Sequence, residues 1–165
     1  MVETFVRMLA SRRESAWQAK IGAYALGYLG DVRGLSELLS AYAEGYQPGI
    51  VAEAIRAFGP VALGPLVDLI EARPEIAKRA AALGALKGMG DALAACLCER
   101  VEARRGDADL AEKAQLYLKL ADLVPHRKPE VAAAVAAALE GKEGKEAQAA
   151  LRAAQRAIGA GKRGK

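Results

Sequence analysis

The side chains that could perform acid–base or thiol chemistry are few and scattered. His126 is the only histidine, and it stands in a basic segment between two expected helices. A general acid or base needs a partner and a pocket, and neither is indicated there. We therefore interpret His126 as a solvated loop residue. Cys96 and Cys98 are two positions apart on an expected helix, so they point in different directions and cannot share a metal ion. We expect Cys96 to pack in the core.

Residues Gly159 to Lys165 contain the spacing GxxxxGK of a phosphate-binding loop. Such a loop needs a preceding strand, a Ser or Thr after the lysine, and a following helix. None of these is present, so we treat the match as chance and expect residues 159–165 to form a basic flexible tail.

No constellation of acid, base or metal ligands is visible elsewhere. We predict a protein that is not an enzyme, with no catalytic residue, no metal site and no cofactor. No apolar segment approaches the roughly 18 residues of a spanning helix, and charges interrupt the first 13 residues. We therefore expect a cytoplasmic protein without a membrane partner. The absence of Asn fits a GC-rich or thermophilic source.

A short pattern recurs along the chain: Ala, apolar, two variable residues, apolar, Gly, then Asp or Pro. Its clear copies begin at Ala25, Ala54 and Ala85, and a degraded copy begins at Leu120. Each copy is followed by apolar residues at i, i+3 and i+4, which share one face of a helix. Each unit is therefore predicted to be a helix, a tight turn and a second helix.

The turn chemistry supports this interpretation. A residue with positive φ closes a helix, and glycine adopts that conformation without steric cost. We expect this at Gly30, Gly59 and Gly90, and we expect Asp31 and Asp91 to cap the helices that follow. The expected helices are a leading helix, four pairs and a last helix, over residues 2–10, 14–29 with 32–44, 49–58 with 63–72, 75–87 with 92–104, 108–123 with 130–139, and 145–158.

Two segments, Trp17 to Glu44 and Ala77 to Glu102, resemble the HEAT-like repeat of the phycobilin-lyase type. The resemblance covers about residues 14–139. It implies an all-α protein built as an α-α superhelix, a right-handed HEAT-like solenoid of about four helical pairs plus terminal capping helices, in a single domain over residues 1–158. It implies no single activity. The deoxyhypusine hydroxylase branch of such repeats uses paired His-Glu motifs for iron, which a chain with one histidine cannot supply.

Aromatic residues are concentrated before residue 60, and only Tyr117 follows. Trp17, Ile21, Tyr24 and Tyr28 form an i, i+4, i+7, i+11 stripe on one expected helix. Core packing is our first interpretation of this stripe. Exposed Tyr and Trp also anchor protein interfaces, so this end of the chain is our first candidate for a partner site.

The leading hypothesis is a non-enzymatic scaffold that binds an unidentified protein partner. The second helices of the pairs would present the shared surface, which is acidic at the start and basic later. The candidate partner-binding residues are Glu37, Ser40, Tyr42, Glu44, Tyr46, Asp68, Glu71, Arg73, Glu99, Arg100 and Arg104.

The alternative is nucleic-acid binding through the C-terminal half. Residues 1–75 carry seven Lys and Arg against nine Asp and Glu, whereas residues 76–165 carry seventeen against eleven. Phosphate contacts would come from Arg104, Arg105, Arg127, Lys128, Lys162 and Arg163. An accessory or lyase-like enzyme is the third hypothesis. Partner identity and oligomeric state are open at this level.

Overall fold

The structure is a computed structural model that describes residues 1–78, 80–140, 142 and 144–162, apart from the side chains at 78, 80, 161 and 162. Within these residues all regular structure is helical, with α-helices joined by short 3-10 helices and no strand. This confirms the predicted all-α class. The chain divides into two compact units, Met1–Met89 and Gly90–Lys165.

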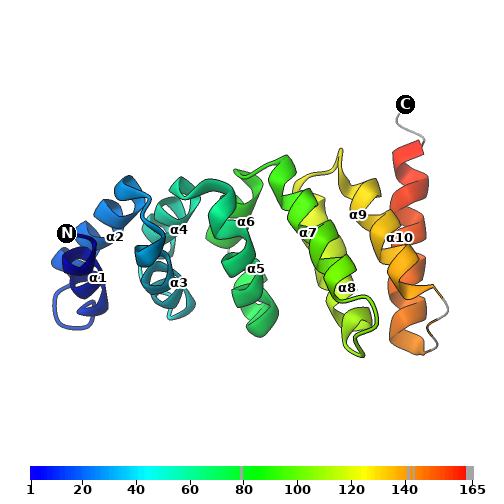
Figure 1. The fold of residues 1–165 in the computed structure, drawn as a ribbon, viewed down its shortest axis with the longest axis horizontal. Coiled ribbons are helices and arrows are strands. Elements are labelled where there is room, and N and C mark those ends of the chain that lie inside the picture. The colour runs from blue at the N-terminus through cyan, green and yellow to red at the C-terminus, as the bar shows by residue number, and fades with distance from the viewer. Residues whose placement is uncertain (79, 141, 143, 163–165) are drawn as a thin grey trace. The chain divides into compact units, whose positions relative to one another are not determined.

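The first unit alternates long helices with short 3-10 turns (Figure 1, blue to green). Helix α2 packs against α1 on one side and α4 on the other, and α4 also packs against α6, while α3 contacts α5. The elements are α1 (Val2–Ala10), α2 (Ala16–Leu29), η1 (Val32–Gly34), α3 (Leu35–Ala43), α4 (Pro48–Ala57), η2 (Gly59–Ala62), α5 (Leu63–Ala72), η3 (Pro74–Lys78) and α6 (Ala80–Lys87).

The second unit is organised around helix α9, which contacts α7, α8 and α10. Its Val131, Val135 and Leu139 are buried, and alanines between them let the neighbouring helices approach closely. This alanine-rich segment is therefore a packed helix of the second unit. The elements are α7 (Asp91–Ala103), α8 (Leu110–Leu120), η4 (Ala121–Leu123), α9 (Lys128–Leu139) and α10 (Lys145–Lys162).

The predicted turns are present. Gly30 and Gly59 both have φ of 62° and follow the ends of α2 and α4, as predicted. Gly90 also has a positive φ, of 56°, but α6 ends at Lys87 and Gly90 is the N-cap of α7, so the expectation that Gly90 closes a helix is wrong. Asp31 caps η1, because its Oδ1 accepts the backbone N–H of Arg33 at 3.0 Å. The same expectation for Asp91 is wrong: Asp91 is the first residue of α7 and makes no capping hydrogen bond.

Helix boundaries differ from the predictions mainly where a 3-10 turn begins or ends an element. The second helix of the first pair, expected to begin at residue 32, begins with η1 and becomes α-helical at Leu35. The helix expected over 108–123 ends with η4, and the helix expected to end at Ile158 continues to Lys162. Short 3-10 turns are common at helix ends, and apolar periodicity does not distinguish them from an α-helical turn.

The core of each unit is aliphatic. The i, i+3, i+4 triplets predicted from the sequence supply much of it: Leu35 and Leu38, then Leu66 and Ile70, then Leu93 and Leu97 are buried. Each fully buried Leu or Ile stabilises the fold by about 1.5–3 kcal/mol relative to an exposed one. Among the described residues, no single helix is both long and apolar enough to cross a lipid bilayer.

Candidate functional site

The most exposed aromatic surface of the described residues is one face of helix α2. The side chains of Trp17, Tyr24 and Tyr28 are 72%, 56% and 92% exposed. At 100° per residue these three lie within about 40° of one another around the helix. Core packing, our first interpretation of this stripe, is therefore wrong for these three residues, and only Ile21 of the stripe is half-buried.

The opposite face of α2 is buried and is made of small residues plus Leu26. A Cβ on Gly22 would lie 2.7 Å from the backbone oxygen of Phe5 in α1, and a Cβ on Gly27 would lie 2.7 Å from the Cα of Ala54 in α4. Real Cβ atoms do not approach so closely, so α1 and α4 can pack here only because these positions are glycine. The small face is buried and the aromatic face is exposed.

The aromatic face carries one cation that has no acidic partner among the described residues. Lys20 is exposed and lies three residues after Trp17 and four before Tyr24, so it shares their side of the helix. Arg56 of the neighbouring α4 is instead bound to Glu53 at 2.6 Å. The face is therefore mainly aromatic with a single positive charge.

The predicted acidic residues of α3 form an internal ion-pair cluster. The guanidinium of Arg12, from the loop after α1, donates to Glu37 Oε1 at 2.6 Å, to Ser40 Oγ at 3.5 Å and to Glu44 Oε2 at 3.2 Å. It also donates to Oε1 of Glu44, and to the backbone oxygen of Leu9 at 3.2 Å. The Arg12 side chain is 8% exposed. These three predicted partner-binding residues are brought together, and they hold the α1–α2 loop on α3.

Arg12 also sets the charge state of this cluster. Its hydrogen bond to Glu44 holds the pKa of that carboxyl below its usual value, and burial opposes the effect only in part. A carboxyl whose pKa is lower in the folded chain stabilises the fold above its unfolded pKa of about 4.3. That stabilisation is lost as pH falls through the lower, folded pKa.

Replacing Arg12 with alanine is therefore expected to lower the thermal unfolding midpoint by roughly 5 °C at pH 7. The difference from the unchanged protein should shrink below about pH 4, as Glu44 becomes protonated in both. The matched control is Arg13→Ala, which removes a neighbouring guanidinium that is 88% exposed and 3.8 Å from Glu44. Equal midpoints for the two variants would show that the Arg12 cluster does not support the fold.

The two predicted tyrosines of this region have different positions. Tyr46 is half-buried, and its hydroxyl donates to the backbone oxygen of Ala16 at 2.8 Å, which ties the loop before α4 to the start of α2. Tyr42 is 0% exposed. The expectation that Tyr42 presents its ring to a partner is wrong, because the ring packs in the core on the inner side of α3.

The remaining predicted partner-binding residues are distributed over both units. Asp68, Glu71 and Arg73 lie on α5 and at its C-terminal end, where Arg73 acts electrostatically on Glu44. Glu99, Arg100 and Arg104 lie on α7 and at its C-terminal end in the second unit. Each group stays a candidate surface of its own unit.

The cations predicted to contact phosphate are paired with carboxylates. Arg105 lies 3.0 Å from Glu102, and Arg104 lies 3.8 Å from Asp107. Lys128 is bound to Asp122. The side chain of Lys162 and all of Arg163 lie outside the described residues.

Arg127, the remaining described cation of that prediction, lies 2.6 Å from Glu130 and 3.5 Å from Asp91. A phosphate would have to displace a carboxylate from each of the four described cations. This arrangement does not favour the nucleic-acid alternative.

His126 has a structural partner. Its Nε2 lies 2.6 Å from Oδ1 of Asp91, and Arg127 reaches the other oxygen of the same carboxylate. The cluster joins the start of α7 to the loop before α9. Both His126 and Asp91 are exposed, as expected for a loop residue.

Neither cysteine is fully buried, and the thiol of Cys98 shows no sign of activation. Cys98 is half-buried, and burial raises the pKa of its thiol, with Glu130 acting in the same direction and Arg127 opposing. A thiol with a raised pKa stays protonated and is a weak nucleophile at neutral pH. Cys96 is half-buried, so it is less enclosed than the core packing expected for it. Among the described residues, no three His, Cys, Asp or Glu side chains are placed to bind one metal ion.

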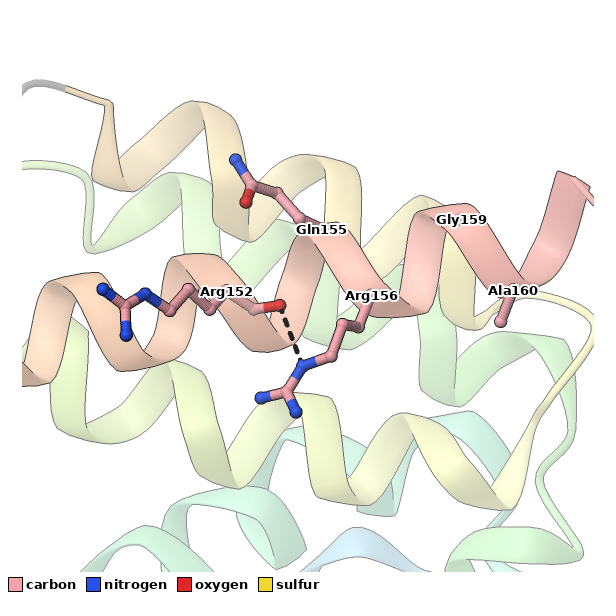
Figure 2. A pocket seen from close by; sticks show the side chains of 5 residues that line it. All are labelled: Arg152, Gln155, Arg156, Gly159 and Ala160. Atoms are coloured by element: carbon pink, nitrogen blue, oxygen red, sulfur yellow. Dashed lines mark hydrogen bonds between the residues drawn. The ribbon is translucent and has the colours of Figure 1, made fainter.

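A surface hollow lies along helix α10 and is lined by Arg152, Gln155, Arg156, Gly159 and Ala160 (Figure 2). Arg156 Nε donates to the backbone oxygen of Arg152 at 3.3 Å. Figure 2 shows the two guanidinium groups pointing in different directions, with Gln155 on another side of the helix. These side chains do not converge on a common point, so the hollow lacks the geometry of a bidentate anion site.

Within the described residues, the fold and surface define an all-helical protein of packed helices with an exposed aromatic helix face. No known protein family matches the chain, and no curated protein and no solved structure matches it.

Proposed function

We propose that this protein is a small, non-enzymatic HEAT-like scaffold that binds protein through the aromatic face of α2. The observation that carries the proposal is the exposure of Trp17, Tyr24 and Tyr28 on the side of α2 away from the core. Tyr and Trp supply large contact areas at small entropic cost, and they are enriched in the energetic centres of interfaces. Large exposed apolar patches are rare on monomeric proteins and commonly mark interaction sites.

The repeat organisation supports the HEAT-like part of the proposal. In the first two units of the pattern, a helix ends at a glycine with φ of 62°, a 3-10 turn follows, and a second helix begins. The first helices α2, α4 and α6 pack side by side, as the corresponding helices of stacked pairs do. A superhelix built from such units would place each pair against the next.

The test is an affinity capture with the purified, tagged chain as bait. Two prey samples are offered separately: nuclease-treated lysate of the source organism, and the purified untagged chain. The expected result is at least one protein retained by the unchanged bait and lost with Trp17→Ala/Tyr24→Ala/Tyr28→Ala. The matched control is Val61→Ala, because Val61 is an exposed apolar residue on η2, off the α2 face. Retention of the same proteins by the triple variant would refute binding through this face, provided its helix content is unchanged by circular dichroism.

A further inference from the structure

The spacing of the aromatic face specifies what kind of element fits on it. Trp17, Ile21, Tyr24 and Tyr28 are separated by four, three and four residues. This is the d-a-d-a spacing of two heptads, which forms the seam of a coiled coil and packs against another helix. Helix α2 uses its opposite face for α1 and α4, so no described helix of the first unit covers the exposed rings of this seam.

The same spacing is symmetric about its midpoint between residues 22 and 23. If a second α2 is laid antiparallel on the first about that midpoint, Trp17 faces Tyr28 of the other copy and Ile21 faces its Tyr24. Every large residue of the seam then meets a large residue. Such self-complementarity is the condition for a two-fold, isologous contact, in which one surface patch serves both subunits.

We propose that two copies of this chain associate through their α2 seams as an antiparallel helix pair. This inference rests on the proposed function and names its partner as a second copy of the chain. The outer layers of the pair are Trp–Tyr contacts, which add about 0.5–1.5 kcal/mol each beyond the area they bury.

The surface area that the seam can bury sets the expected affinity of the dimer. At about 200 Å² per ring, the exposed parts of the three aromatics offer about 400 Å² per copy. With the Lys20 stem, a pair would bury about 1,000 Å² in total, the size of a weak, transient interface. We therefore expect a reversible dimer with a dissociation constant on the order of 10 µM.

Charge does not prevent this pairing. Lys20 is the only charged side chain within the seam segment from Trp17 to Tyr28. In the antiparallel arrangement the two Lys20 residues are offset by five residues, or about 7.5 Å along the axis, so they do not face each other directly. Each ammonium lies beside tyrosine rings, which attract cations.

The experiment is sedimentation equilibrium of the purified chain over roughly 1–300 µM, a range that spans the expected dissociation constant. The fluorescence of Trp17, the only tryptophan, is recorded over the same range. We expect the mass to rise from monomer to dimer, with a blue shift of Trp17 emission as its 72% exposed ring is buried. Tyr24→Ala should weaken the dimer at least about 100-fold, because each dimer loses two interface tyrosines.

Val61→Ala is the control and should leave the mass profile unchanged. Both variants place alanine, a good helix former, at an exposed position, so circular dichroism should show unchanged helix content. A chain that stays monomeric to 300 µM, or a dimer unaffected by Tyr24→Ala, would overturn the inference. In either case, the proposed function would still stand if the affinity capture retained a lysate protein through the aromatic face. If the sedimentation experiment and the affinity capture both failed, the proposed function would be refuted as well.

Discussion

Replacing Tyr42 with alanine is expected to lower the free energy of unfolding by about 3–5 kcal/mol. The ring is fully buried in the first unit, where α3 packs against α1, α4 and α5. Its removal would take away a large apolar contact and leave a cavity that the surrounding helices fill only in part. The measurement is urea unfolding followed by circular dichroism, at a protein concentration of about 1 µM so that self-association does not contribute.

The matched control is Tyr28→Ala, the same chemical change at a ring that is 92% exposed. We expect it to change stability by no more than about 0.5 kcal/mol, because an exposed tyrosine on a helix loses little when it is shortened. The two variants thus separate the effect of a buried tyrosine from that of an exposed one on the aromatic face of α2. If they lost equal stability, Tyr42 would not be a core residue, and its candidacy as a partner-binding residue would return.

The second large effect is expected at Gly22. A single added methyl group, Gly22→Ala, places a Cβ 2.7 Å from the Phe5 backbone oxygen and 3.0 Å from the Leu9 backbone nitrogen. Backbone atoms cannot swing away as a side chain can, so α1 must move off α2. We expect a net loss of about 1–3 kcal/mol, although alanine favours the helix by up to about 1 kcal/mol.

The control for this prediction is the same substitution at Gly84, in helix α6 of the same unit. A Cβ there meets no other atom within 4 Å. Gly84→Ala should therefore stabilise the protein by about 0.5–1 kcal/mol, the helix-propensity gain alone. The two Gly→Ala changes should have opposite signs in urea unfolding. Stabilisation by both would mean that α1 does not pack on α2 at the distance the structure shows.

Residues distant in sequence determined the chemistry of the candidate sites. Arg12 finds its carboxylate partners on α3, 25 and 32 residues later in the chain. His126 finds Asp91 35 residues earlier. No local spacing rule relates such positions, so Glu37 and Glu44 could be recognised from the sequence as exposed acids of a helix but not as partners of one buried guanidinium.

The sequence by itself determined the helices and the turns between them. Both depend on local rules: apolar side chains at i, i+3 and i+4 define a buried helix face, and a glycine with positive φ follows the end of a helix at Gly30 and Gly59. Only the tertiary structure decided which side of α2 is buried. That helix has two apolar sides, and the aromatic side has the larger apolar side chains, so the sequence favoured burial of the aromatic side. The small side is buried because Gly22 and Gly27 let two helix backbones approach, and close packing of neighbouring helices outweighed the burial of three rings.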